Sequence, residues 1–173
     1  MIDPATRVSA TLPDWLADLL TQQATEATGA PTPRQASAVE ITSFGYGHPA
    51  PPPEADIVVD ARRRFRNPHA DPAMRELTGL HDSVRAHVLA TPGVAAVIRH
   101  TARLAAELTT ATTTATTTAT TVAASGPVTV AVGCVGGRHR SVAMAEAIAA
   151  ELANAGLTVA VVHRDVHLPV IQR

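Results

Sequence analysis

The stretch VAVGCVGGRHRSVAMAEAIAAEL, residues 130–152, constrains the fold of this chain more than any other feature. It begins with valines, which favour a strand, and continues into a turn that holds Gly133, Gly136 and Gly137. The residues after the turn are rich in alanine and are apolar at helical spacing, which predicts a helix. A strand joined to a helix by a short glycine turn indicates an α/β fold.

Other segments extend the pattern. Strands are predicted within VEITSFGYGHP, ADIVVDAR and GLTVAVVHRDV, and a helical pattern over residues 83–108 is interrupted near Pro92 and Gly93. Strands separated by helices require crossover connections, so we expect a mostly parallel sheet covered by helices. Ligands bind such sheets at the carboxyl ends of the strands. The polar segments at those ends are residues 43–48, 60–66, 133–141 and 163–165.

The chain divides into two predicted parts. Residues 1–38 are expected to form an N-terminal helical appendage and linker, and residues 39–173 the ligand-binding domain. The apolar residues at helical spacing in the appendage are Leu12, Trp15, Leu16, Leu19 and Leu20. Within the domain, the threonine-rich residues 109–125 are expected to be a low-complexity connector, because β-branched residues are poor helix formers.

Composition excludes several classes of protein. All 14 basic residues are arginines, so a Walker-type phosphate loop and a lysine Schiff base are both excluded. The single cysteine cannot form an internal disulfide. No apolar run approaches the roughly 18 residues of a membrane span, and the first residues do not resemble a signal peptide. We therefore expect a cytoplasmic protein that does not associate with membranes.

The histidines do not form a metal-binding pattern. Eight are present, but no H-E-x-x-H sequence or cysteine–histidine cluster occurs. His163 and His167 are four residues apart at a strand end, where this spacing does not bring two side chains together. We expect no metal and no cofactor.

The glycine turn is a predicted anion site. Its glycines let the main chain approach a ligand closely, and the following helix directs its free amides and positive dipole end at the turn. Arginine and histidine side chains add positive charge there, and a serine hydroxyl can donate a hydrogen bond. The predicted phosphate-binding residues are Gly136, Gly137, Arg138, His139, Arg140 and Ser141.

An alternative interpretation of the same turn is catalytic. Residues 134–141 fit C-x-x-G-x-x-R-[ST], the phosphate loop of cysteine-dependent phosphatases. In that chemistry Cys134 is the nucleophile, activated by the helix dipole and by Arg140. The residue before Cys134 is Gly133 rather than the usual histidine. A general acid is not evident, although Asp56, Asp60, Asp71 and Asp165 are available.

A third interpretation concerns RNA. The densest basic run comprises Arg62, Arg63, Arg64 and Arg66, which could bind either a ligand phosphate or an RNA backbone. The formal net charge is −1, so RNA binding has to come from one local face. Aromatic side chains on which bases could stack are few.

Five segments together resemble a known family. ITSFGYGHP, ADIVVDAR, NPHADPAMRELTGL, GCVGGRHRS and VVHRD occur in the order seen in the C-terminal domain of the RapZ family of RNase adapter proteins. The resemblance covers residues 39–173. The family's N-terminal nucleotide-binding domain, with its Walker loop, is not among these 173 residues.

The resemblance implies a regulatory protein that binds glucosamine-6-phosphate or a related amino-sugar metabolite or nucleotide-sugar, with no need for catalysis. It implies an α/β fold similar to part of a sugar-phosphate kinase, and a small RNA or a protein as a further partner. We also expect a homo-oligomer. Carried onto this chain, the sugar or supporting contacts are Ser43, His48, Arg62, Asn67, His69 and Arg75.

Three departures from the family pattern concern the pocket. The usual GCTGG is GCVGG here, so Val135 lacks a hydroxyl that could bond a ligand. Gly47 replaces a basic residue, and the segment from Asp60 to His69 is one residue longer than usual. We expect phosphate binding to survive these changes better than the exact sugar preference.

Overall fold

The computed structural model describes residues 37–65, 68, 71–118 and 126–171. The chain divides into two compact units, Met1–Gln35 and Ala36–Arg173, and the described residues belong to the second. The predicted N-terminal helix lies outside the described residues, as do Arg66, Asn67 and His69 of the predicted site.

A four-stranded sheet in which every strand pair is parallel forms the centre of the unit, as predicted. Its strands are β1 (Val39–Gly45), β2 (Ile57–Asp60), β3 (Val128–Cys134) and β4 (Val159–His163), in the order β2-β3-β1-β4. The register pairs Ser43 of β1 with Val132 of β3 and with His163 of β4. Because all strands run the same way, the loops that follow them meet at one edge of the sheet, which we call the carboxyl edge.

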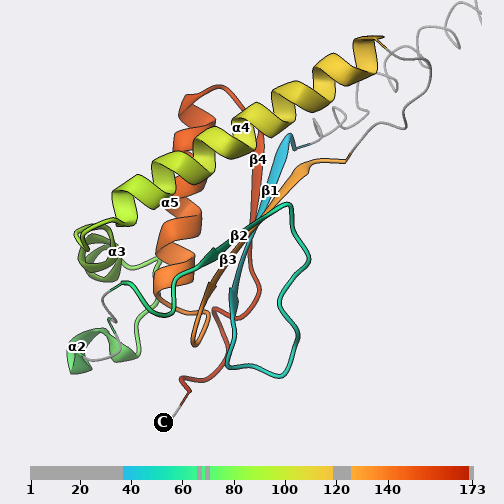
Figure 1. Ribbon diagram of the computed structural model, residues 1–173. Helices are drawn as coiled ribbons and strands as arrows, with labels where there is room; N and C mark the ends of the chain where they lie inside the picture. Colours follow the sequence, from blue (N-terminus) through green and yellow to red (C-terminus); the bar gives the residue numbers. More distant parts are fainter. Residues whose placement is uncertain (1–36, 66–67, 69–70, 119–125, 172–173) are drawn as a thin grey trace, which may run out of the picture. The chain divides into compact units, whose positions relative to one another are not determined.

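Four described helices connect the strands (Figure 1). They are α2 (Pro72–Arg75), α3 (Asp82–Leu89), α4 (Val94–Thr118) and α5 (Arg140–Asn154). The interruption predicted near Pro92 separates α3 from α4, where Gly93 adopts a positive φ of 88°. The short α2, which the sequence did not predict, is capped by the Asp71 carboxylate, which accepts a hydrogen bond from the Ala73 amide.

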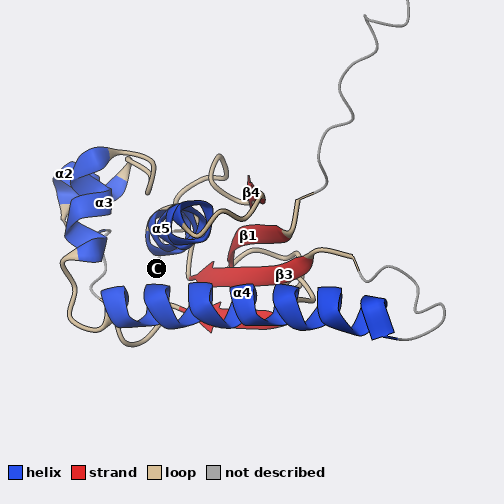
Figure 2. Cartoon of the chain, turned by 90° about the horizontal axis from the view of Figure 1, so that it is seen from above, coloured by secondary structure: helices blue, strands red, loops and turns tan. Residues whose placement is uncertain are grey.

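The helices α4 and α5 pack on the same face of the sheet and against each other (Figure 2). The strands β2, β3 and β4 follow one another in a single direction across the sheet, so their crossovers lie on one side. The alternate strand residues that face these helices form the core with them. The largest fully buried side chains of this core include Ile41, Val130, Val132, Met144, Ile148 and Leu152. None of the described helices is long and apolar enough to cross a membrane.

The threonine-rich segment differs from its prediction as a connector, because α4 continues through Thr118. The Thr109 hydroxyl donates to the Ala105 carbonyl at 2.9 Å, and the Thr110 hydroxyl donates to the Ala106 carbonyl at 3.0 Å. Such bonds to the preceding turn satisfy a threonine hydroxyl without interrupting the helix. Residues 119–125 lie outside the described part of the chain.

Candidate functional site

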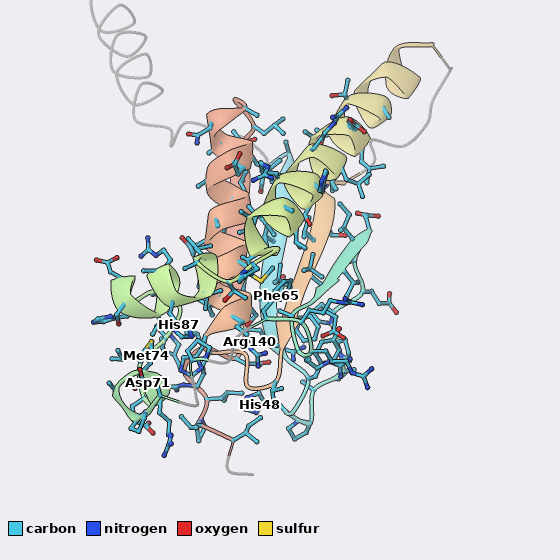
Figure 3. The ribbon with its side chains drawn as sticks, turned by 60° about the vertical axis from the view of Figure 1, so that its left-hand side comes forward. His48, Phe65, Asp71, Met74, His87 and Arg140 are labelled. Carbon is cyan, nitrogen blue, oxygen red and sulfur yellow. The ribbon has the colours of Figure 1, made fainter. Side chains whose placement is uncertain are left out.

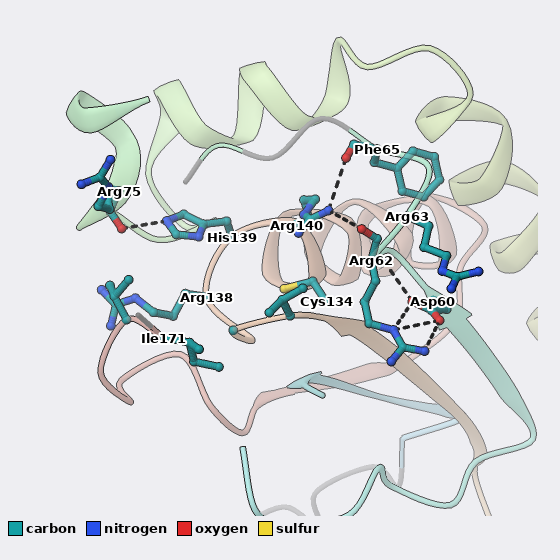
Figure 4. A pocket seen from close by; sticks show the side chains of 13 residues that line it. Asp60, Arg62, Arg63, Phe65, Arg75, Cys134, Arg138, His139, Arg140 and Ile171 are labelled. Atoms are coloured by element: carbon teal, nitrogen blue, oxygen red, sulfur yellow. Dashed lines mark hydrogen bonds and ion pairs between the residues drawn. The ribbon is translucent and has the colours of Figure 1, made fainter. Parts of the chain in front are cut away.

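A cavity of about 1110 Å³ opens at the carboxyl edge of the sheet (Figure 4). It is formed by the loops after β2, β3 and β4 together with α2. The residues that line it are Asp60, Arg62, Arg63, Phe65, Arg75, Cys134, Val135, Gly136, Arg138, His139, Arg140, Val170 and Ile171. The structure therefore brings eight of the residues selected from the sequence, including Cys134, to one cavity. Figure 3 shows His48 and Arg140 at this same end of the ribbon, where α5 begins.

The glycine turn after β3 is tightly packed against its neighbours. Gly137 has a φ of +68°, and a Cβ added there would lie 2.7 Å from the Asp165 Cβ and 2.8 Å from the Gly45 nitrogen. The Gly45 amide in turn donates to the Asp165 carboxylate at 2.7 Å. Three main-chain segments, from the ends of β1, β3 and β4, thus meet at this point, which explains why Gly137 has to lack a side chain.

The turn leads directly into α5, which begins at Arg140. In the described chain, the N-cap residue His139 makes no capping hydrogen bond with its side chain. The first amides of an α-helix have no partner within the helix, and the helix dipole places partial positive charge beside them. The cavity therefore borders a helix N-terminus of the kind that binds phosphate groups.

The Arg138 side chain bonds the main chain rather than extending freely into the cavity. Its Nη1 donates to the carbonyls of Leu168 at 2.7 Å and Val166 at 3.3 Å, and its Nη2 donates to the Glu76 carbonyl at 2.9 Å. The main-chain carbonyl of Arg138 accepts a bond from the Gly79 amide at 2.7 Å. Arg138 therefore joins the end of α2 to the residues after β4.

The next two side chains join the turn to other walls of the cavity. His139 Nε2 lies 3.1 Å from both the Met74 and Arg75 carbonyls, to which its N–H donates. Arg140 Nη1 donates to the carbonyls of Ala61, Arg62 and Phe65 at 3.0–3.3 Å. Both residues are buried. Their hydrogen bonds hold α2 and the segment after β2 around the turn, while the Arg140 charge stays beside the cavity.

Arg62 lies at the rim, fixed by two neighbours. Its Nη2 is 2.6 Å from Asp60 Oδ2, and its guanidinium carbon is 3.7 Å from the centroid of the Tyr46 ring. The hydrogen bonds from Arg62 hold the pKa of Asp60 below its usual range, against the opposing effect of burial. The cavity lining contains five arginines and this single carboxylate, so it carries an excess of positive charge.

Cys134 lies at the base of the turn. Its Sγ is 3.2 Å from the Oγ of Ser141, and both residues are buried. The thiol nevertheless borders the cavity. The Arg140 side chain, which a phosphatase of this loop type would aim at the phosphoryl oxygens, has its Nη1 hydrogen-bonded to main-chain carbonyls.

Four of the predicted ligand contacts in the described part of the chain do not line the cavity. Gly137 and Ser141 are buried behind it, and His48 Nε2 lies 3.2 Å from the Gly136 carbonyl. Ser43 is fully buried on the helix-facing side of the sheet.

The Ser43 hydroxyl belongs to a hydrogen-bonded chain of three side chains. It lies 2.9 Å from His163 Nδ1, and His163 Nε2 lies 3.0 Å from Glu146 Oε1. Because Ser43 has no exposed surface, this serine–histidine–carboxylate chain is an internal link of β1, β4 and α5. Arg64, from the predicted RNA-binding run, is exposed and does not line the cavity.

Two apolar residues of the lining, Val170 and Ile171, had no signal in the sequence. They follow β4 in a stretch with neither helical nor strand periodicity, and only their three-dimensional position assigns them to the site. Phe65 and Asp60 could be identified as candidate lining residues from the sequence, because they lie within or close to the run of arginines at residues 62–66. Among the described residues, no group of three or more potential metal ligands is clustered.

A glycine turn and a helix N-terminus at a basic cavity, on the edge of a parallel sheet, form an arrangement that this domain shares with a broad class of anion-binding α/β domains. The family can be stated more closely. Residues 37–167 match the family model of the RapZ C-terminal domain, so the chain belongs to that family, as the sequence motifs indicated.

Relatives with this domain are known in several bacteria. The chain is 41% identical over 125 residues to a nucleotide-binding protein of Streptomyces coelicolor, a match that covers 72% of this chain and 38% of that protein. It is 46% identical over 131 residues to a nucleotide-binding protein of Thermus thermophilus, covering 74% and 42%, respectively. The chain thus spans about two fifths of the length of these relatives.

Proposed function

We propose that this domain is a cytoplasmic regulatory module that senses a phosphorylated amino sugar, or a related nucleotide-sugar, in the cavity at the carboxyl edge. The observation that carries the proposal is the lining itself, in which five arginines and one aspartate surround a glycine turn at the start of α5. Guanidinium groups and helix amides are the groups that bind phosphate. The relatives that are named nucleotide-binding proteins also support a phosphorylated ligand.

In this proposal the phosphate binds the main-chain amides around Gly136, and the exposed arginines Arg63 and Arg75 neutralise its charge. Arg62 is held in place for the same task by Asp60 and Tyr46. The turn residues Arg138, His139 and Arg140 build the walls and contribute a fixed field. Asn67 and His69 are proposed as sugar contacts on the family resemblance.

The first experiment is a calorimetric titration of the full chain with glucosamine-6-phosphate, UDP-N-acetylglucosamine and inorganic phosphate. Saturable binding that prefers one of the two sugars over bare phosphate is the expected result. Equal weak binding of all three, or no binding, would overturn the proposal of a sugar sensor.

Arginine variants test whether binding occurs in this cavity. Replacing Arg63 or Arg75 by alanine is expected to weaken binding of the preferred ligand about ten- to hundredfold, since a hydrogen bond to a charged group contributes about 1.5–3 kcal/mol. Arg99→Ala is the matched control, because Arg99 is an exposed arginine of α4 outside the cavity lining. An equal loss in the Arg99 variant would indicate nonspecific attraction of the anion.

A cysteine-dependent phosphatase is the alternative that one observation favours, namely that Cys134 borders the same basic cavity. The experiment is turnover of p-nitrophenyl phosphate and of glucosamine-6-phosphate by the wild-type chain and by Cys134→Ser. A phosphatase would lose turnover in the variant while keeping its affinity for phosphate. A sensor would show no turnover in either protein and similar binding in both.

The exposed residues Arg63 and Arg64 support RNA as a further partner at the cavity rim. Filter retention of a small RNA at increasing salt is the test, with Arg63→Ala/Arg64→Ala as the variant. A salt-dependent complex that the variant loses would support RNA binding. Retention that is unchanged by the substitutions would exclude this surface. Self-association and binding of a protein partner are tested separately. Each would appear as an increase in the mass of the particle that contains the chain, measured in solution with and without ligand.

A further inference from the structure

One wall of the cavity is made by the residues after β4, which have no regular secondary structure. We call residues 164–171 the C-terminal segment. Its start is firmly fixed, since Asp165 is buried, accepts a hydrogen bond from the Gly45 amide and pairs with Arg164 at 2.8 Å. Its end borders the cavity through Val170 and Ile171.

Arg138 holds the part of the segment between these two ends. Its Nη1 bonds the Val166 and Leu168 carbonyls, and its Nη2 bonds the Glu76 carbonyl across the cavity wall. Figure 4 shows Arg138 beside Ile171, on the opposite side of the cavity from Phe65. A single side chain of the turn therefore bonds the main chain of the segment at two positions.

Ile171, at the end of the segment, packs against the loop after β1. Its Cδ1 lies 2.5 Å from where a Cβ on Gly47 would be, so it packs directly on the main chain of the loop after β1. The Gly47 amide donates to the Val135 carbonyl of the glycine turn at 2.9 Å. The end of the segment therefore contacts a loop that is itself bonded to the turn.

We infer that Arg138 is a positioning residue that couples the anion site to the C-terminal segment. The main chain of Arg138 is part of the turn, whereas its side chain makes hydrogen bonds to the C-terminal segment. A ligand that fixes the turn also fixes the base of this side chain, and an ordered segment keeps the turn ready for the ligand. Such coupling is reciprocal. The inference rests on the proposed function, because it requires a phosphorylated ligand at the turn.

The first test is hydrogen–deuterium exchange of the full chain, with and without glucosamine-6-phosphate. Without ligand, Arg138→Ala is expected to speed exchange of the peptide that covers residues 164–171, while α4 and the centre of α5 stay protected. Arg138→Lys is expected to behave like the alanine variant, because a lysine ammonium cannot bridge two walls as the planar guanidinium does. Ligand should slow exchange of this peptide in the wild type only. Unchanged exchange in both variants would overturn the inference.

The second test is a double-mutant cycle on ligand affinity. Arg138→Ala and a chain ending after His167 are each expected to weaken binding about tenfold, within the range of about five- to 150-fold that is typical of coupling between two sites. Together they should weaken it no more than either alone, because both remove the same wall. If the fold-losses in affinity of the two single variants multiply in the double variant, the inference is overturned, and Arg138 contacts the ligand directly. Arg99→Ala serves as the charge-matched control.

The outcomes separate this inference from the proposed function. If the wild-type chain binds none of the ligands, the proposed function fails and the coupling fails with it. If the wild type binds and the shortened chain binds equally well, only the inference fails. A circular dichroism spectrum and a thermal melt of each variant verify that the domain is folded.

Discussion

At the scale of the residue, the adjacent glycines Gly136 and Gly137 of the turn have different roles. Gly137 adopts a positive φ, and atoms of Asp165, Gly45 and Phe44 lie within 3.1 Å of the position that a Cβ would occupy there. Gly136 has an ordinary φ, and nothing lies within 4 Å of its own Cβ position. Gly137 therefore serves the fold, whereas Gly136 leaves open space in the cavity.

Alanine substitutions should separate these two roles. Gly137→Ala is expected to lower the free energy of unfolding by about 1–2 kcal/mol from the left-handed conformation alone, and further from the close contacts. Gly136→Ala is the control and should leave stability within about 0.5 kcal/mol of the wild type. Urea denaturation measures both values. Equal losses in the two variants would contradict the assignment.

Asp165 gives stability a defined dependence on pH. Burial raises the pKa of this carboxyl, but hydrogen bonds from Arg164 and the Gly45 amide outweigh burial, and the net pKa lies below its usual range. A carboxyl with a lowered folded-state pKa stabilises the fold above its unfolded pKa of about 3.9. This contribution is lost as the pH falls through the folded-state pKa.

The corresponding variant is Asp165→Asn. Its free energy of unfolding should fall below that of the wild type at pH 7, and the difference should shrink as the pH is lowered below about 4. Denaturant titrations from pH 7 to pH 2 measure this trend. Asp56 and Asp60 also have lowered pKa values, so both proteins should still lose stability in acid. A difference that stays constant with pH would contradict the role of the charge.

At the scale of the element, β1, β4 and α5 are joined by a polar link in an otherwise apolar interface. The chain from Ser43 through His163 to Glu146 lies on the helix-facing side of the sheet. An unpaired buried hydroxyl costs about 1–3 kcal/mol. The link therefore favours the one register in which Ser43 lies beside His163.

Replacing His163 by leucine tests this link. We expect the free energy of unfolding to fall by about 1–3 kcal/mol, because the Ser43 hydroxyl loses its partner. In Ser43→Ala/His163→Leu the loss should be smaller than in His163→Leu alone, since no hydroxyl is then left unpaired. Thermal and urea unfolding measure the wild type, Ser43→Ala, His163→Leu and the double variant. Additive losses would contradict a direct link.

The strands and long helices could be predicted because their signals are local. The valine runs, the glycine turn and the Pro92–Gly93 break each lie within a few residues of the structure they cause. The hydrogen bonds made by the side chains of Arg138, His139 and Arg140 could not be predicted, since the carbonyls that accept them lie on segments distant in sequence. The burial of Ser43 also required the register of β1 against β4.

At the scale of the whole molecule, the described core lies entirely within the second compact unit. We therefore expect a chain that begins at residue 36 to fold cooperatively and to bind the preferred ligand with the affinity of the full chain. Urea unfolding and calorimetry of the shortened protein test this expectation. A loss of cooperative unfolding would show that residues 1–35 are required for the fold.

The position of Cys134 also gives the molecule a built-in reporter. It is the single thiol of the sequence, is 3% exposed, and borders the cavity at the base of the glycine turn. Because no other thiol competes, the rate at which a small alkylating reagent labels the chain measures access to this one position. An occupied cavity should slow the labelling, so mass spectrometry of intact protein would report occupancy without any introduced probe.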